Sequence, residues 1–162
     1  MRTGQYTLVT GGAGFVGSNL ADALLARGER VVLADNLSRD GVRINAEWLQ
    51  SRHPDLVRLE TVDIRDAAAI GELVDGARAV YHLAAQVAVT TSLEDPTDDL
   101  QTNLIGTFNI LEAIRARPDP PPLLPQVYDR PGARLLDHRH GRVELLTAVT
   151  AERMEDVPGE TL

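Results

Sequence analysis

The chain has 162 residues, 43% of them hydrophobic and 25% charged, a balance typical of one globular domain and not of a disordered segment. Its net charge of −8 argues against binding nucleic acid, because phosphate backbones are bound by clustered Lys and Arg. No apolar run approaches the roughly 20 residues of a transmembrane helix. We expect no membrane partner, no signal peptide and, with cysteine absent, a cytoplasmic location.

Strands and helices are predicted to alternate along the first two thirds of the chain. The predicted strands are 6–10, 30–35, 56–62 and 79–83. The predicted helices are 18–27 with Gly28 as its C-terminal cap, 42–52, 67–74 and 98–117. Their predicted apolar faces are Leu20, Leu24 and Leu25 in the first helix, Ile44, Trp48 and Leu49 in the second, and Leu100, Leu104, Phe108, Leu111 and Ile114 in the last. This alternation implies right-handed crossovers and a parallel sheet with helices on both faces.

The pattern changes after the last of these helices. Residues 117–125 (RPDPPPLLP) hold five prolines, which a central strand does not tolerate. Residues 129–142 are polar, and 143–157 have the spacing of one more amphipathic helix. We therefore divide the chain into a domain over 1–117 and a Pro-rich linker with a divergent tail over 118–162.

A glycine triplet joins the first predicted strand to the first predicted helix. Gly11, Gly14 and Gly17 stand three residues apart. A tight strand-to-helix turn needs residues without side chains, and the N–H groups at a helix N-terminus attract a pyrophosphate. The triplet by itself is also compatible with a plain turn. Its place between a strand and a helix of a βαβ unit favours dinucleotide binding.

Asp35 ends the second predicted strand. In a dinucleotide-binding domain a carboxylate at this point accepts hydrogen bonds from the adenosine ribose and repels a 2′-phosphate, which favours NAD over NADP. Arg39 argues the other way, because an arginine accommodates a 2′-phosphate. The alternative for Asp35 is an aspartate that only forms the turn after the strand.

The third and fourth predicted strands also end in residues suited to a nucleotide. Asp63 is placed to bond an adenine amino group and Ile64 to pack on the ring, with helix capping as the alternative for Asp63. After the fourth strand, the small residues Ala84 and Ala85 allow a cofactor to approach the backbone. Close packing of helix on strand is the alternative there.

Taken in order, these motifs resemble the NAD-dependent epimerase/dehydratase family, which are extended short-chain dehydrogenases/reductases acting on nucleotide sugars. They are TGGAGFVG at 10–17, Asp35, Asp63-Ile64, HLAA at 82–85 and Asn103-x-x-Gly106-Thr107. DNLSR at 35–39 with Asn45-x-x-Trp48-Leu49, and QVAVTTS at 86–92 with Asp95-Pro96, are similar to the CDP-paratose (CDP-tyvelose) 2-epimerase subgroup. The resemblance covers about 5–117 and implies an α/β fold, a Rossmann-like doubly wound parallel sheet, truncated and with a divergent C-terminal tail.

The resemblance also implies a cofactor, NAD, a nucleotide-sugar substrate and roles for individual residues. The residues implied at the cofactor are Gly11, Gly14, Phe15, Val16 and Gly17 for the pyrophosphate, Asp35, Asn36, Ser38 and Arg39 for the adenosine ribose, Asp63 and Ile64 for adenine, and Ala84, Ala85 and Gln86 for the nicotinamide side. Asn103 would support this site by a hydrogen bond across the sheet, unless it is an ordinary residue of a helix interior. Thr90, Thr91 and Ser92 would face the sugar nucleotide.

The family's catalytic pair, Tyr-x-x-x-Lys, is not found in this sequence. In that pair tyrosine is the general base and lysine lowers its pKa. All 16 basic residues are arginine, and Tyr128 is followed at the lysine position by Gly132. The family's fifth strand is not recognisable after Leu124, nor is its C-terminal sugar-binding half. We therefore assign no catalytic residue.

Three interpretations follow. The chain is the NAD-binding portion of a nucleotide-sugar epimerase or dehydratase, catalytically incomplete as given; or a non-catalytic NAD-binding module whose partner supplies the missing half; or a remnant of a truncated or frameshifted gene. The resemblance leaves open a homodimer or a partner that carries the missing half, since the family often dimerises through the helix predicted at 98–117 together with a later helix, and only the first of these is found. We predict no metal site, since His138 and His140 lack a third ligand.

Overall fold

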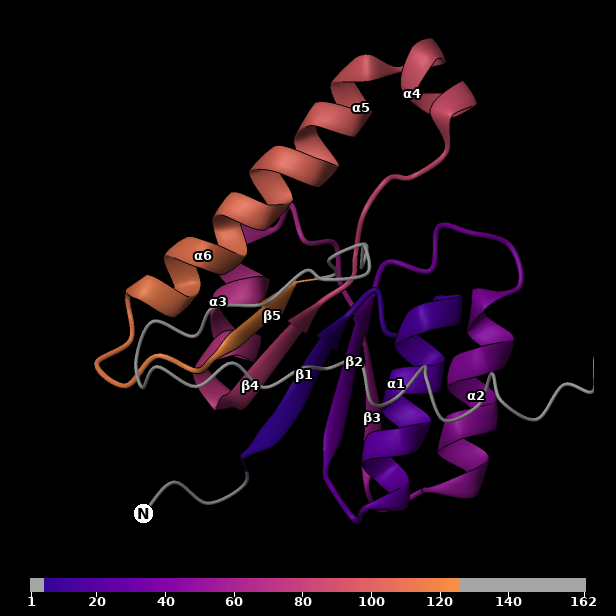
Figure 1. Ribbon diagram of the computed structural model, residues 1–162, viewed down its shortest axis with the longest axis vertical. Coiled ribbons are helices and arrows are strands. Elements are labelled where there is room, and N and C mark those ends of the chain that lie inside the picture. The colour runs from indigo at the N-terminus through magenta and orange to yellow at the C-terminus, as the bar shows by residue number, and fades with distance from the viewer. Residues whose placement is uncertain (1–4, 126–162) are drawn as a thin grey trace, which may run out of the picture. The chain divides into compact units, whose positions relative to one another are not determined.

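The structure, a computed structural model, describes residues 5–125 (Figure 1). Within them lies a parallel five-stranded sheet of order β3-β2-β1-β4-β5. The strands are β1 Tyr6–Thr10, β2 Val31–Asp35, β3 Val57–Thr61, β4 Ala77–His82 and β5 Leu123–Pro125. The helices are α1 Phe15–Ala26, α2 Val42–Arg52, α3 Ala67–Gly76, α4 Val89–Glu94, α5 Pro96–Leu100, the π-helix η1 Gln101–Gly106 and α6 Thr107–Arg115. The predicted Rossmann-like parallel fold is confirmed.

The alternation of side chains along each strand gives the sheet two apolar faces. Val9 and Leu33 are buried in one core, together with Ala21, Leu24 and Leu25 of α1 and Ala46 and Leu49 of α2. Leu8 and Val32, their neighbours in sequence, are buried in a second core with Ile70 and Val74 of α3 and Ile110 of α6. Figure 1 accordingly shows α1 and α2 on one side of the sheet and α3 and α6 on the other.

The strand order places a switch point at the centre of the sheet. From β1 the chain adds β2 and then β3 on one side, and returns across β1 to add β4 and β5 on the other. The loops after β1 and β4 therefore leave the sheet in opposite directions. In open α/β sheets a ligand crevice forms at the carboxyl ends of such a strand pair.

The face predicted for α2 was correct for Leu49 and wrong for Ile44 and Trp48. Ile44 is 68% and Trp48 43% exposed, whereas Leu49 and Ala46 are fully buried. Ala46 and Leu49 are spaced i, i+3 and turn toward α1, where the small side chain of Ala46 allows the two helices to approach. Trp48 instead lies under the guanidinium of Arg52, 5.0 Å from its ring centroid.

The segment expected as one helix over 98–117 is continuous but not uniform, because it passes from α5 through the π-helix η1 into α6. Of the predicted apolar stripe, only Ile114 packs against the core. Leu100, Leu104, Phe108 and Leu111 are all exposed, while Ile110 and Gly106 are buried. The absence of a side chain at Gly106 explains this choice of face, since a Cβ there would lie 2.5 Å from Cδ1 of Ile64.

A fifth strand was not expected in the proline-rich segment, and this prediction was wrong. β5 pairs in parallel with β4, with Leu123 opposite Val80 and Leu124 opposite Tyr81. The strand is three residues long and lies at the end of the strand order, where a missing N–H is tolerated. It lies within 118–162, which the sequence analysis assigned to linker and tail.

Several expectations concern other parts of the chain. The helix expected at 143–157, Tyr128, and His138 with His140 lie outside the described residues. Over 5–125 no helix combines the length and apolar character needed to cross a bilayer.

Candidate functional site

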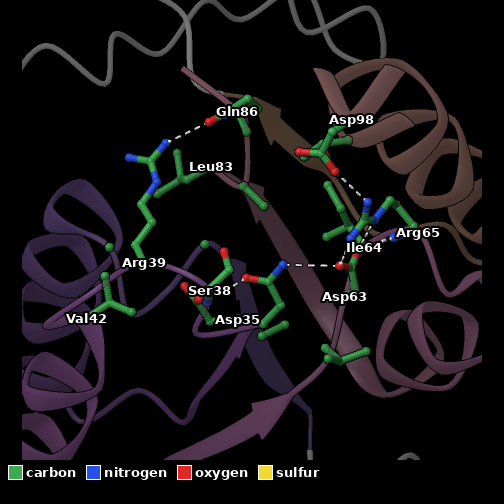
Figure 2. A pocket seen from close by; sticks show the side chains of 18 of the residues that line it. Asp35, Ser38, Arg39, Val42, Asp63, Ile64, Arg65, Leu83, Gln86 and Asp98 are labelled. Carbon is green, nitrogen blue, oxygen red and sulfur yellow. Dashed lines mark hydrogen bonds and ion pairs between the residues drawn. The ribbon is translucent and has the colours of Figure 1, made fainter. Parts of the chain in front are cut away.

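A cleft of about 510 Å³ lies at the carboxyl ends of the strands (Figure 2), a volume typical of ligand sites. It begins at the switch point between β1 and β4 and extends past β2 to β3. Its lining residues are Gly11, Gly14, Ala34, Asp35, Asn36, Ser38, Arg39, Val42, Val62, Asp63, Ile64, Arg65, Leu83, Ala84, Ala85, Gln86, Ala88, Asp98 and Thr102.

The loop after β1 brings bare backbone to the cleft. Gly11 has φ +67°, and a Cβ on it would lie 2.7 Å from the Ala84 nitrogen on the loop after β4. Gly14 is the N-cap of α1 and provides no side-chain hydrogen bond, whereas the N-cap Asp66 of α3 accepts from two backbone N–H groups of its own helix. The first-turn N–H groups of α1 therefore have no carboxylate cap, and their dipoles favour an anion.

Asp35 ties the second strand to the glycine loop. Its Oδ2 accepts a hydrogen bond from the Ala13 N–H at 3.0 Å, and its Oδ1 accepts from the Leu37 N–H at 2.9 Å. The bond from Leu37 closes the turn that was the alternative prediction for Asp35. Asp35 therefore forms this turn and also holds the glycine loop. Because a carboxylate has about four acceptor positions, Asp35 retains capacity for a ribose diol.

Arg39 and Gln86 meet across the cleft from the loops after β2 and β4, as Figure 2 shows. An Arg39 Nη2–H donates to Gln86 Oε1 at 3.3 Å, and the same oxygen accepts from the Val87 N–H at 3.0 Å. An exposed guanidinium thus lies on the side of the cleft where Asp35 would bind a ribose. This contact connects the two loops that border the switch point.

At the β3 end, Arg65 holds Asp63 on one side and Asp98 of α5 on the other (Figure 2). Its Nη2 donates to Asp63 Oδ2 at 2.6 Å and its Nη1 to Asp98 Oδ1 at 2.7 Å. The side-chain hydrogen bonding of Arg65 to Asp63 is the largest cause that lowers the pKa of Asp63 to about 2. Asp63 is thus ionised at neutral pH. The capping alternative for Asp63 was wrong, because Asp66 caps α3.

Asn103 fixes the loop after β4 from within the π-helix. Its Oδ1 accepts from the Gln86 N–H at 2.8 Å, and its Nδ2 donates to the Gln86 carbonyl at 2.9 Å and to Asp99 Oδ1 at 2.9 Å. The side chain satisfies both backbone groups of a cleft residue, which an ordinary residue of a helix interior would not do. It does not itself line the cleft.

His82, at the end of β4, links this loop to the helix in a single tautomer. Thr107 donates its hydroxyl to the Asn103 carbonyl at 2.7 Å, so it must accept from His82 Nε2–H at 2.9 Å. Nδ1 is then the acceptor, and Thr10 donates its hydroxyl to it at 2.8 Å. Burial lowers the pKa of His82 below its usual 6.5, consistent with the neutral ring that this network requires.

Most residues expected at the site lie together in the cleft, but not all contribute a side chain. Phe15 is 82% exposed and Val16 is also exposed, and neither lines the cleft. Gly17 is buried against the glycine loop. Thr90 is exposed on α4, which also carries Thr91 and Ser92. In the part of the chain that the structure describes, no group of three or more acidic or histidine side chains is arranged to hold a metal ion.

Arg65, Asp98 and Thr102 also line the cleft, although none of them was predicted from the sequence. Arg65 directly follows the Asp63-Ile64 motif, and this adjacency is a signal that sequence reasoning could have used. Nothing in the spacing of residues 65 and 98 connects them, because α5 reaches β3 only through the tertiary fold.

Comparison with known proteins shows what the chain is similar to. Residues 8–121 match the protein family described as GDP-mannose 4,6 dehydratase. The chain is 44% identical over 112 residues to a CDP-paratose 2-epimerase of Salmonella typhi, covering 67% of this chain and 32% of that protein. It is 43% identical over 110 residues to a dTDP-glucose 4,6-dehydratase of Mycolicibacterium smegmatis, with coverages of 67% and 32%.

A solved structure agrees with these relatives. The UDP-glucose 4-epimerase of Thermus thermophilus, determined in complex with NAD, superposes with a TM-score of 0.58 at 42% identity, over 68% of this chain and 34% of that one. The chain thus spans about a third of the length of the relatives it matches.

Proposed function

Because the chain belongs to the GDP-mannose 4,6 dehydratase family of NAD-dependent epimerases and dehydratases, we propose that it binds NAD in the cleft at the ends of β1 to β4. This membership agrees with the resemblance drawn from the motifs, and a CDP-paratose 2-epimerase is among the relatives. The bound nicotinamide would supply hydride transfer to and from a sugar carbon. The chain's own residues bind and orient the cofactor.

One observation carries the proposal: the uncapped N-terminus of α1 and the bare loop before it face a cleft in which Asp35 lies beside that loop. The pyrophosphate would accept from the N–H groups of Phe15, Val16 and Gly17, whose side chains are not needed for this contact. A Cβ at Gly11 would lie 2.7 Å from the Ala84 backbone nitrogen, so glycine is needed for the two loops that border the cleft to meet. The uncapped N–H groups of α1 are the part of this loop region that would hold the phosphate.

The remaining roles follow the cleft from β2 to β4. Asp35 would accept from the adenosine ribose hydroxyls, with Asn36, Ser38 and Arg39 beside them. Asp63 and Ile64 would enclose adenine. The proposed residues on the nicotinamide side are Ala84, Ala85 and Gln86, held by Asn103. α4, with Thr90, Thr91 and Ser92, would lie toward a sugar nucleotide.

We propose that the whole activity is epimerisation or dehydration of a nucleotide sugar, to which this chain contributes the cofactor-binding portion. The 162 residues contain no lysine, so the tyrosine–lysine pair implied by the resemblance would have to come from another polypeptide or from further sequence. The alternative is an NAD-binding module without catalysis. Turnover of a CDP- or UDP-sugar by the chain alone would contradict the incomplete-enzyme proposal.

We also propose a homodimer through the exposed apolar row on α5, η1 and α6. Leu100, Leu104, Phe108 and Leu111 are large, apolar and exposed along one continuous helical segment. Such a row is costly to leave in water. A second copy can present the same row to it about a two-fold axis.

The test of NAD binding is calorimetric titration of the full chain with NAD and with NADP. We expect saturable binding of NAD that Asp35→Ala weakens at least tenfold, because one or two hydrogen bonds to a charged group are lost. Asp40→Ala is the matched control, since Asp40 is exposed nearby and does not line the cleft. Absence of NAD binding by a chain with an α/β circular dichroism spectrum would reject the proposal.

A further inference from the structure

The carboxylate of Asp63 is already filled by donors from its own chain. Its Oδ1 accepts from the Arg65 backbone N–H and from Arg65 Nε, both at 2.9 Å. Its Oδ2 accepts from Arg65 Nη2 at 2.6 Å and from Asn36 Nδ2 at 3.1 Å. An ionised carboxylate offers about four acceptor positions, so none is left for a ligand. An amino group of a base reaches Asp63 only by displacing one of these donors.

The four donors are not equal. Three belong to Arg65, whose side chain makes a charge-assisted fork with Asp63 and is also held by Asp98. The fourth belongs to Asn36, a neutral and exposed amide on the loop after β2, and it is the longest of the four contacts. Replacing the amide N–H of Asn36 by the amino N–H of a purine substitutes one uncharged donor for another. Displacing the guanidinium would leave a charge unpaired.

We propose that Arg65 is the positioning residue for base recognition in this cleft: it fixes the carboxylate of Asp63 so that the position now taken by Asn36 is the one that receives the 6-amino group of a purine. The inference rests on the proposed binding of NAD and adds to it the group that selects the base. Asn36 gives up its hydrogen bond to Asp63 when the base enters, while its Oδ1 still accepts from the Ser38 N–H.

The bridge from Arg65 to Asp98 gives this arrangement its stiffness. Asp98 lies in the first turn of α5, and it holds Arg65 from the side opposite Asp63, as Figure 2 shows. The guanidinium is therefore fixed at both ends. Asp98 of α5 and Thr102 of η1 also line the cleft. The Arg65 side chain therefore connects α5 to the end of the cleft that is proposed to hold the purine.

The test compares two dinucleotides that differ only at the base: NAD, with a 6-amino group, and nicotinamide hypoxanthine dinucleotide, with a 6-oxo group. Binding of each to the full chain is measured by calorimetry. We expect the unchanged chain to prefer NAD about tenfold, the effect of one hydrogen bond together with an acceptor facing an acceptor. In Arg65→Gln the preference should fall to within about twofold, because the carboxylate is no longer held. In Asn36→Ala it should stay the same or rise, because the competing donor is gone.

Arg58→Gln is the matched control, since Arg58 pairs with Glu60 on β3 and does not line the cleft. The preference of Arg58→Gln for NAD over the hypoxanthine dinucleotide should equal that of the unchanged chain. Arg65→Lys, which keeps the charge but cannot make the fork, should also lose most of the preference and serves if Arg65→Gln does not fold. Equal binding of both dinucleotides to the unchanged chain, or an undiminished preference in both Arg65 variants, would overturn the inference while leaving NAD binding intact. No binding of either dinucleotide would instead reject the proposed function, and this inference with it.

Discussion

Single residues at the strand ends show what chemistry the sequence reveals and what it hides. Asp35 and Asp63 were both predicted as ligands of one nucleotide from their places after two strands. The structure shows that they differ, because Asp35 has used two of its acceptor positions and Asp63 all four. A residue's type and place in the chain set its charge. Its remaining capacity to bond depends on neighbours such as Arg65 and Asn36, which the fold positions.

At the same scale, His82 makes the stability of the fold depend on pH. Its pKa is lowered in the folded chain and is about 6.5 in the unfolded chain. The unfolded state therefore binds the proton more readily, and the stability due to neutral His82 is fully present above pH 6.5 and is lost as the pH falls through the folded-state pKa.

Urea unfolding followed by circular dichroism between pH 8 and pH 5 measures this effect. We expect the free energy of unfolding to fall more steeply below pH 6.5 in the unchanged chain than in His82→Gln, which has no group that titrates at this position. The other histidines are common to both proteins and cancel in the comparison. Parallel pH profiles would show that His82 is not held neutral by the fold.

At the scale of elements, hydrophobic periodicity located the helices better than it oriented them. The bounds of α2 were predicted correctly, yet Ile44 and Trp48 point outward. At the end of η1, the small residue Gly106 selects the buried face, since it allows this helical segment to contact Ile64. A count of apolar residues favours the largest side chains. Close packing instead favours the face on which backbones can approach, and this depends on the partner element.

Two glycines at helix positions should respond in opposite ways to the same substitution. A Cβ at Gly17 in α1 would collide with the Gly11 carbonyl oxygen and lie 2.7 Å from Gly12 Cα, which are backbone atoms with little room to move. Gly71 in α3 has no such neighbour within 4 Å. Gly17→Ala should cost about 1–3 kcal/mol. Gly71→Ala should stabilise the fold by up to about 1 kcal/mol, because alanine is the better helix former.

Urea midpoints of the two variants measure the contrast, and Gly71→Ala is the control for the effect of adding a methyl group. Equal stability of Gly17→Ala and the unchanged chain would mean that the turn between β1 and α1 can relax. The close backbone approach on which the proposed phosphate cradle rests would then not be required.

At the scale of the whole molecule, the exposed row on α5, η1 and α6 is an apolar surface that residues 5–125 of a single copy do not cover. We expect the chain to sediment as a dimer at micromolar concentration. Leu104→Glu combined with Phe108→Glu should convert it to a monomer, because charges would be buried in the interface. Ile44→Glu, at an exposed apolar residue of α2, should leave the dimer intact. A monomeric unchanged chain would reject the proposed interface.

The sequence by itself determined the alternation of strands and helices, the glycine turn, the acidic ends of β2 and β3 and the class of cofactor expected there, because each of these depends on local spacing and side-chain chemistry. It did not reveal β5, because prolines exclude a central strand, and only the strand order shows that among residues 5–125 this one is at an edge. The tertiary structure alone decided that Arg65 reaches Asp98, that Asn103 holds Gln86 and that His82 has one tautomer. These are contacts between elements far apart in the chain, and their geometry follows from how two layers of helices pack on the sheet.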